Sequence, residues 1–336
     1  MPSNNQPGLF EDETPPLADD NSVPARKRGI EPAAVDATAA DLAARLSSRL
    51  HLGTSSWSFP GWQGLVYAGE HSESSLSRNG LAAYSRHPLL RSVGIDRTFY
   101  APIAEADYAR YASQVPDGFR FLVKAPMAIT SSYLRDDEGK FSDSPFYLDV
   151  EYATREFVQP CMAGLSGKAG PLVFQFPPQG RDVTRHPDPF INRLYRFLKA
   201  LPAGPLYAVE VRDPELLTDR FFMCLKTTGA RFCVASHARM PAPSRQIELA
   251  NSVMGTGDFI ARWSLHSGFK YEDAKSRYSP FNKLVDEDLD SRESLARACM
   301  LALNNGFDAY VIVNNKAEGS APLSIGKLAQ CMLDLA

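Results

Sequence analysis

Short apolar segments alternate with amphipathic segments along most of the chain, and this alternation predicts the fold. The apolar segments have the length of strands, and they lie at 50–55, 90–96, 119–124, 171–176, 206–212, 231–236, 258–263 and 308–314. Segments with helical spacing lie at 39–50, 81–87, 105–114, 150–162, 189–201, 217–228, 291–305 and 325–335. Strands that alternate with helices are typical of a parallel sheet, and eight such units close a (β/α)8 barrel. We therefore predict an α/β fold of the TIM-type barrel class.

A doubly wound open sheet is the alternative to the barrel. That fold often carries a GxGxxG turn after its first strand, and none follows residue 55. The longest loops follow predicted strands, at 57–79, 126–148, 176–188, 237–257 and 264–289. Loops of this kind build the active face of a TIM-type barrel, so we expect the extra material on one rim.

The segment 206–214, LYAVEVRDP, shows how one strand would fit a closed barrel. Side chains alternate along a strand, so Ala208, Glu210 and Arg212 share one face and the neighbouring valines share the other. The valines suit packing against helices outside the barrel. The two charges would then point inward near the carboxyl end of the strand.

Polar or aromatic side chains stand at or just after the ends of most predicted strands. They are Ser55, Trp57, Asp96, Lys124, Gln175, Glu210, Arg212, Ser236, His237, Arg262, Asn314 and Asn315. Converging buried polar groups are costly unless they serve one another or a ligand. Because so many strands end this way, we predict a functional site at the carboxyl end of the barrel.

Two of these residues are predicted to be catalytic. Glu210 would be a general acid or base, and Lys124 would hold negative charge through an inward ammonium with a tunable pKa. Each has a structural alternative. Glu210 and Arg212 would form a buried ion pair, and Lys124 would reach solvent past the barrel lip.

The remaining predicted site residues would bind the substrate. Arg212 would grip a carboxylate or phosphate, and Gln175 suits orientation better than proton transfer. The asparagines either cap the following loop or hydrogen-bond the ligand. The full set is Arg212, Gln175, Asn314, Asn315, Asp96, Tyr100, Trp57, Arg262 and His266.

Composition narrows the class of partner. The 336 residues include 36 basic and 39 acidic side chains, so the net charge of −3 argues against nucleic acid and anionic membranes. No apolar run approaches the roughly 20 residues of a membrane helix, and the amino terminus lacks a signal sequence. We expect a cytoplasmic protein whose partner is a small-molecule ligand.

Cysteine and histidine usage predicts neither disulfides nor a metal or cofactor site. The cysteines are odd in number, 5, with no CxxC spacing, and those at 224, 233 and 299 lie in apolar segments. Buried free thiols in a reducing compartment follow. The 6 histidines form no HxH or HExxH pair.

The amino-terminal segment differs from the rest of the chain. Residues 1–38 are rich in Pro, Asp, Glu, Ser and Ala and offer little that could form a core. We predict a disordered N-terminal tail at 1–38 and a single barrel domain at 39–336, whose first helix starts near Thr38 or Asp41.

Six motifs in this order resemble a known family. They are GTSSWSFPGWQGLVY (53–67), VGIDRTFYAP (93–102), VPDGFRFLVKAP (115–126), GPLVFQFPP (170–178), AVEVRDP (208–214) and VNNKAEGSAP (313–322). The chain resembles the YecE-like family, domain of unknown function 72, from about residue 51 to 335. The resemblance implies a TIM-type barrel but no established activity. This chain departs from the family's usual motifs at Gly94 and Asp96, in the second strand motif VExNxTFY, and at Ser131, where members commonly carry His.

Three functional hypotheses remain open. The first is an enzyme (a hydrolase, isomerase or lyase) with an anion-binding pocket, acting on a small polar or anionic metabolite by metal-independent acid/base chemistry. The second is a divalent-metal hydrolase or isomerase that uses Asp96, Glu210 and His266. The third is a non-catalytic ligand-binding or regulatory barrel, which the changes at Gly94 and Ser131 favour.

Overall fold

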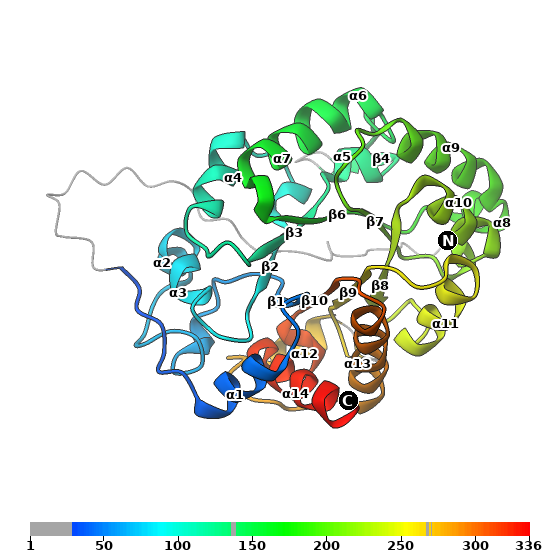
Figure 1. The fold of residues 1–336 in the computed structure, drawn as a ribbon. Helices are drawn as coiled ribbons and strands as arrows, with labels where there is room; N and C mark the ends of the chain where they lie inside the picture. Colours follow the sequence, from blue (N-terminus) through cyan, green and yellow to red (C-terminus); the bar gives the residue numbers. More distant parts are fainter. Residues whose placement is uncertain (1–28, 136–138, 267–268, 270) are drawn as a thin grey trace, which may run out of the picture.

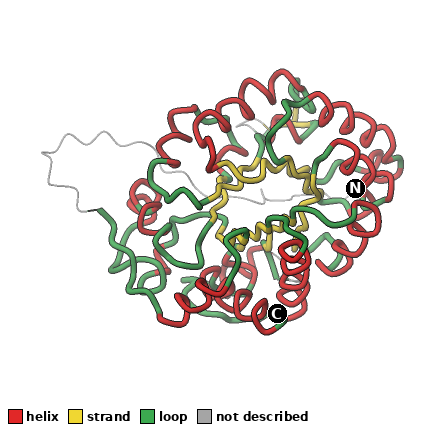
Figure 2. Tube along the Cα trace, viewed as in Figure 1, coloured by secondary structure: helices red, strands yellow, loops and turns green. Residues whose placement is uncertain are grey.

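Eight parallel strands form a closed barrel in the computed structural model, which describes residues 29–135, 139–266, 269 and 271–336 (Figures 1 and 2). The strands are β1 (Leu50–Thr54), β2 (Ser92–Ile95), β3 (Arg120–Lys124), β6 (Ala169–Phe176), β7 (Tyr207–Val211), β8 (Arg231–Ser236), β9 (Phe259–Trp263) and β10 (Ala309–Val313). They follow one another around the ring in chain order, and β10 closes it by pairing with β1. The predicted barrel and its eight strands are confirmed.

Helices surround the barrel on its outside (Figure 2). They are α1 (Ala37–Arg45), α2 (Glu73–Asn79), α3 (Leu81–Tyr84), α4 (Glu105–Ala112), α5 (Met127–Thr130), α6 (Val150–Ala153), α7 (Gln159–Leu165), α8 (Arg181–Arg185), α9 (Pro187–Ala200), α10 (Asp219–Thr228), α11 (Pro243–Met254), α12 (Tyr271–Tyr278), α13 (Leu289–Asn304) and α14 (Ala321–Asp334). A π-helical segment, Thr154–Val158, joins α6 to α7, so the expected helix at 150–162 is present in three parts.

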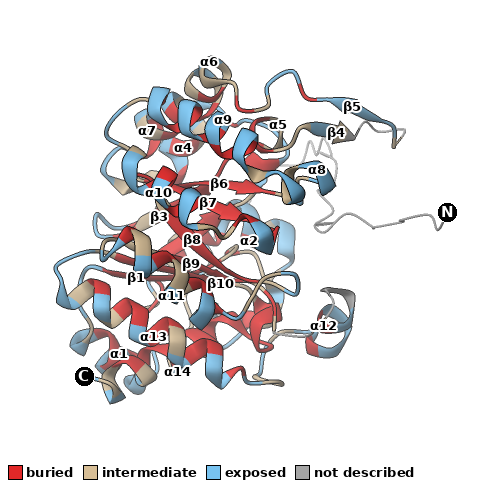
Figure 3. Ribbon diagram, turned by 90° about the vertical axis from the view of Figure 1, so that its right-hand side faces the viewer, coloured by how far each residue is buried: buried red, intermediate tan, exposed pale blue. Residues whose placement is uncertain are grey.

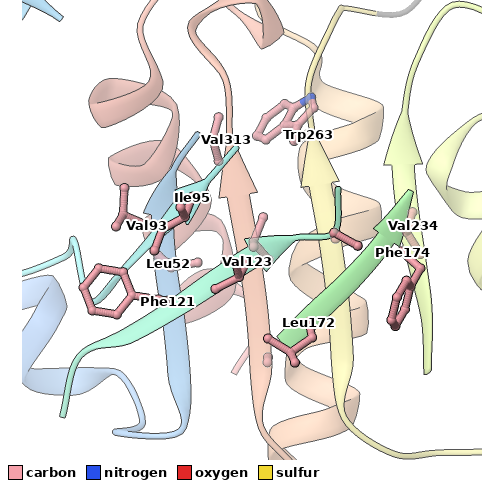
Figure 4. Close-up of a cluster of buried hydrophobic side chains, with 14 of the residues drawn as sticks. Leu52, Val93, Ile95, Phe121, Val123, Leu172, Phe174, Val234, Trp263 and Val313 are labelled. Carbon is pink, nitrogen blue, oxygen red and sulfur yellow. The ribbon is translucent and has the colours of Figure 1, made fainter. Parts of the chain in front are cut away.

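Alternation along the strands divides the core into two parts. Outward side chains pack beneath the helices, among them Val93, Phe121, Phe174 and Trp263 (Figure 4). The inner part is smaller and fills the barrel with Leu122, Val173, Ala208, Cys233, Ile260, Tyr310 and Ile312. On β7 the outer core takes Val209 and Val211, and the inner core takes Ala208, as the sequence predicted. Figure 3 shows the buried strands at the centre and the exposed outer faces of the helices.

Several segments predicted as loops contain regular structure, and the expectation of a loop at 237–257 is wrong. Helix α11 fills most of that segment and is the crossover between β8 and β9. Pro243 begins it, and Gln246 faces the sheet, where it hydrogen-bonds both backbone groups of Ala235. Helix α2 lies within 57–79, α12 lies within 264–289, and a hairpin of β4 (Tyr133–Arg135) and β5 (Phe141–Asp143) lies within 126–148.

The first helix is displaced from its predicted bounds. It begins after Asp36, whose carboxylate accepts a hydrogen bond from the backbone N–H of Thr38, and it ends at Arg45 rather than at residue 50. Ahead of it, Pro32 forms a bridge with Tyr67 in the loop after β1. Of the predicted tail, residues 1–28 lie outside the described residues.

Two further expectations concern membranes and thiols. In the part of the chain that the structure describes, no helix combines the length and the apolar character needed to cross a membrane. All five cysteines are free, and Cys224, Cys233 and Cys299 are buried, as predicted.

Candidate functional site

The carboxyl ends of the strands bring polar side chains together inside the barrel. Lys124 ends β3, Gln175 and Glu210 lie one residue before the ends of β6 and β7, and Arg262 lies near the end of β9. All four are buried, with exposed fractions of at most 4%. Together with two residues that directly follow strands they form what we call the charged cluster, which consists of Asp96, Lys124, Gln175, Glu210, Arg212 and Arg262.

Strand register explains why these side chains meet. Gln175 lies directly beside Glu210 in the β6–β7 pairing, one inward position beyond the pair Val173 and Ala208 of the inner core. Arg262 occupies the corresponding inward position of β9, beyond Ile260. Parallel strands of a barrel present their carboxyl ends on one face, so these inward positions converge.

Arg262 joins the two carboxylates of the cluster. Its Nη1 donates to Glu210 Oε2 and to Gln175 Oε1, each at 3.0 Å, and its Nη2 donates to Asp96 Oδ2 at 2.8 Å. The Asp96 side chain is 30% exposed, so it connects this buried network to the surface. Arg262 therefore links Gln175 of β6, Glu210 of β7 and Asp96, which directly follows β2.

Glu210 is completely buried and forms an ion pair with a second arginine. Arg212, which follows β7, forms an ion pair with Glu210 Oε1. Burial alone would raise the pKa of Glu210, but the positive charges of Arg212, Arg262 and Lys124 together hold it below its ordinary value. Burial by itself would lower the pKa of Arg262. The negative charges of Asp96 and Glu210 outweigh the effect of burial, so the pKa of Arg262 is raised. Glu210 and Arg262 are thus a charged pair at neutral pH.

Lys124 is the titratable member of the cluster. Burial lowers its pKa from 10.5 to about 7; Asp96 and Glu210 oppose this decrease, while Arg262 and Arg212 reinforce it. The Nζ atom lies 3.4 Å from the centre of the Phe99 ring. Phe99 belongs to a short 3-10 turn, Arg97–Phe99, that follows β2. Burial therefore favours the neutral amine of Lys124 over its ammonium form.

The asparagines after β10 make contacts within the loop they begin. Asn314 donates from Nδ2 to Ser55 Oγ at 2.9 Å, and its Oδ1 accepts from the backbone N–H of Lys316. Asn315 is buried, and its Oδ1 accepts from Trp62 Nε1 at 3.1 Å and from the backbone N–H of Ala321. These contacts are the ones expected if the two asparagines cap the loop after β10, which is one of the two roles predicted for them.

The remaining residues predicted to bind the substrate are Trp57, Tyr100 and His266. They lie in segments that follow the carboxyl ends of strands, and their surroundings differ. Trp57 is buried, packs edge-on against Tyr111 of α4 and donates from Nε1 to a backbone carbonyl of α2. Tyr100 is 58% exposed and packs edge-on against Phe99. The backbone N–H of His266 donates to the Lys316 carbonyl, and its ring packs edge-on against Phe269.

Sequence reasoning missed two residues beside the cluster. Phe99 covers Lys124, and the thiol of Cys233 lies 3.9 Å from Glu210 Oε2. His237, already named among the polar residues at strand ends, has its pKa lowered to about 4 by burial and by the charge of Arg212, which the charge of Glu210 opposes. Cys233 could have been found from alternation on β8, because Phe232 and Val234 face the outer core.

The carboxylates do not form a cation site. Arg262 lies between Asp96 and Glu210, so both carboxylates already neutralise guanidinium groups. Among the described residues, no group of three or more His, Cys, Asp or Glu side chains is arranged to hold a metal ion. This geometry does not fit the hypothesis of a divalent-metal centre.

Two shallow hollows lie away from the cluster. Both are lined by Arg231, Asp258 and Phe259, which mark the amino ends of β8 and β9. Neither hollow includes a residue of the charged cluster. The anion-binding pocket stays a prediction.

Fold and site together define an α/β barrel of the TIM type with a buried charged cluster at the carboxyl end of its strands. Residues 51–334 match the family described as Protein of unknown function DUF72, and the chain belongs to that family. The resemblance seen in the six motifs is thereby confirmed.

Solved structures from the same family share this fold. A DUF72 family protein from Enterococcus faecalis V583 is 18% identical, with a TM-score of 0.58 over 84% of this chain and 95% of that chain. Another from Thermotoga maritima MSB8 is 19% identical, with a TM-score of 0.57 over 85% of this chain and 99% of that chain. A search of curated proteins finds no match.

Proposed function

We propose that this protein is an enzyme that acts on a small metabolite bearing one negative charge, with Lys124 as the group that transfers a proton. The observation that carries the proposal is a lysine buried at the carboxyl end of the barrel, with a pKa lowered to about 7 by burial and by two neighbouring arginines. A group with a pKa near the working pH is suited to general acid–base catalysis.

The charges of the cluster favour an anionic ligand. Asp96 and Glu210 balance Arg212 and Arg262, so a protonated Lys124 adds one positive charge to a buried site. An excess of one sign of charge in a buried site is costly unless a charge of the other sign offsets it. A ligand with one negative charge would offset that excess, and it would raise the pKa of Lys124 on binding.

The contacts favour different roles for the two residues predicted to be catalytic. Two arginines hold Glu210 in its ionised form, which suits positioning of those arginines better than proton exchange. Lys124, once neutral, would accept a proton from the substrate, while Arg212 would stabilise the negative charge that develops. This step is common to hydrolases, isomerases and lyases, and it requires no cofactor.

The state of the cysteines bears on the cellular location of the protein. The five free cysteines are consistent with a reducing compartment, so we propose the cytoplasm as the place where the enzyme meets its substrate.

A thermal-shift screen with small carboxylates, phosphorylated metabolites and neutral sugars would test the proposal. We expect stabilisation by one class of anion, its loss in Arg212→Met, and its retention in Arg181→Met, which removes an exposed arginine of α8. Conversion of the stabilising compound should be lost in Lys124→Met. A compound that stabilises the protein and is never converted would favour the non-catalytic binding barrel instead.

A further inference from the structure

We propose that Lys124 forms an imine with the carbonyl carbon of a small 2-oxo carboxylic acid, whose carboxylate is bound by Arg212. This inference rests on the proposed function and names the substrate class of the same site. It depends on three features of the charged cluster: the position of the Lys124 amine, the hydrogen bonds of the two arginines, and the balance of charge.

The first feature is the surroundings of the Lys124 amine. Its side chain is 1% exposed, with Nζ against the ring of Phe99, and it senses the charges of Arg212 and Arg262. Lysines become nucleophiles when burial and neighbouring cations make the uncharged amine accessible at neutral pH. The lowered pKa agrees with this role.

The second feature distinguishes the two arginines. Arg262 uses Nη1 for Glu210 and Gln175, and it uses Nη2 for Asp96. Arg212 uses Nη2 for Glu210, whereas its Nη1 is buried and has no hydrogen-bond partner among the described residues. Arg262 also has a buried donor without a hydrogen-bond partner among the described residues, its Nε, but both of its terminal nitrogens are in use. Since an unsatisfied buried donor is costly, Arg212 is the arginine with a terminal nitrogen available for a ligand carboxylate.

The third feature is the charge of the covalent product. A protonated imine on Lys124 carries one positive charge, in addition to the balanced set of Asp96, Glu210, Arg212 and Arg262. The single carboxylate of a 2-oxo acid neutralises it. A neutral ketone would leave one excess positive charge, and a doubly charged phosphate ester would leave one excess negative charge.

The chemical step balances without an oxidant or reductant. The neutral Nζ attacks the carbonyl carbon, a C–N bond forms, and the carbonyl electron pair moves to oxygen, which takes up the proton released by nitrogen. The carbinolamine then takes up one proton from solvent and loses its hydroxyl as water, which leaves the protonated imine with one positive charge. Arg212 holds the adjacent carboxylate throughout and keeps the carbonyl carbon beside Nζ.

Reductive trapping tests the inference on the full chain. We expect pyruvate with cyanoborohydride at neutral pH to leave a carboxyethyl group on Lys124, located by peptide mass spectrometry. Lys199, an exposed lysine of α9, serves as an internal control and should stay largely unmodified. Hydroxyacetone, a carbonyl compound without a carboxylate, should label Lys124 at least about ten-fold less, which is the effect of losing one charged hydrogen-bonded pair.

Variants separate binding from covalent chemistry. Arg212→Met should lower the labelling of Lys124 by pyruvate about ten-fold or more, and Arg212→Lys should restore part of it, because a positive charge is retained. Labelling of Lys199 equal to that of Lys124 would overturn the inference. So would pyruvate that stabilises the folded protein without forming an adduct, although the proposed function would then stand. If no anion stabilises the protein and no adduct forms, both proposals fail.

Discussion

Lys124 and Glu210 are both buried in the charged cluster, and the pKa of each is lowered, which favours the neutral form of the lysine and the charged form of the glutamate. Burial is the dominant influence on Lys124 and favours the neutral amine, whereas the arginines around Glu210 overcome burial and favour the carboxylate. At the scale of residues, burial thus favours the neutral form of Lys124, and the arginines favour the charged form of Glu210.

The pH dependence of stability should reveal the buried lysine. The folded-state pKa of Lys124 lies below its ordinary value, so the unfolded state binds more protons between about pH 7 and 10.5, and stability rises with pH across that window. Between about pH 6 and pH 9, Lys124→Met should remove up to about 3 kcal/mol of this rise. Urea denaturation at about pH 6 and about pH 9 measures it.

Lys199→Met is the control for this experiment, because it removes an exposed lysine from α9. Its stability should follow the wild-type pH dependence. The groups that face Lys124 from other strands, namely Asp96, Glu210, Arg212 and Arg262, are unchanged in both variants. Parallel curves for Lys124→Met and the wild type would show that Lys124 is protonated throughout.

Removing the charge of Glu210 should destabilise the protein strongly. Glu210→Gln leaves Arg212 and Arg262 buried with one fewer negative partner, and breaking a buried pair costs about 3–5 kcal/mol. Glu293→Gln, in an exposed pair with Arg297 on α13, should cost at most about 1 kcal/mol. Urea denaturation at neutral pH compares the two; equal losses would mean that the buried pair adds little.

At the scale of elements, close contact between neighbouring strands limits the residues that the barrel accepts. Gly53 of β1 lies against the backbone of β2, where an added Cβ atom would come within 2.0 Å of the Ser92 carbonyl oxygen. Backbone atoms cannot move aside as a flexible side chain would. A residue without a side chain is therefore required where these two strands approach.

Gly53→Ala should destabilise the protein by about 3 kcal/mol or more, because the added methyl group overpacks the β1–β2 contact. Gly167→Ala is the matched control, since no atom lies within 4 Å of its added Cβ position. Thermal unfolding followed by circular dichroism measures both variants. Similar melting temperatures for the two would contradict the close contact.

At the scale of the whole molecule, the segment before α1 is attached to the loop that follows β1. The backbone N–H of Ala33 donates to the Val66 carbonyl, and that of Ala68 donates to the Glu31 carbonyl, each at 2.9 Å. The attached segment thus begins within the stretch that composition assigned to the tail. Its last residues behave as part of the barrel domain.

Two truncations test this boundary. Removal of residues 1–28 should leave the melting temperature unchanged, because their composition offers little to a core. Removal of residues 1–35 deletes both backbone hydrogen bonds and should cost about 2 kcal/mol, while Asp36 still caps α1. If the shorter truncation is as harmful as the longer one, the tail has a role in stability.

Much of the fold could be predicted because periodicity is a local property of the chain. Alternation between Val209 and Glu210, or between Val123 and Lys124, already assigns each residue to the outside or the inside of a parallel barrel. The same logic identified all eight strands. It failed at α11, because Pro243 and the polar residues after it obscured a helix whose buried face includes Gln246.

The contacts of the site could not be predicted from local patterns. Arg262 meets Glu210 and Asp96 across 52 and 166 positions of the chain, and its choice of partners depends on how the closed barrel staggers its strands. The pKa of Lys124 likewise depends on burial and on four charges from three other strands. Residue types and their spacing were enough to place charged groups at one end of a barrel. Closure of the barrel determined which arginine pairs with each carboxylate, and it buried Lys124. Distances between side chains and their exposure to solvent exist only in the folded protein.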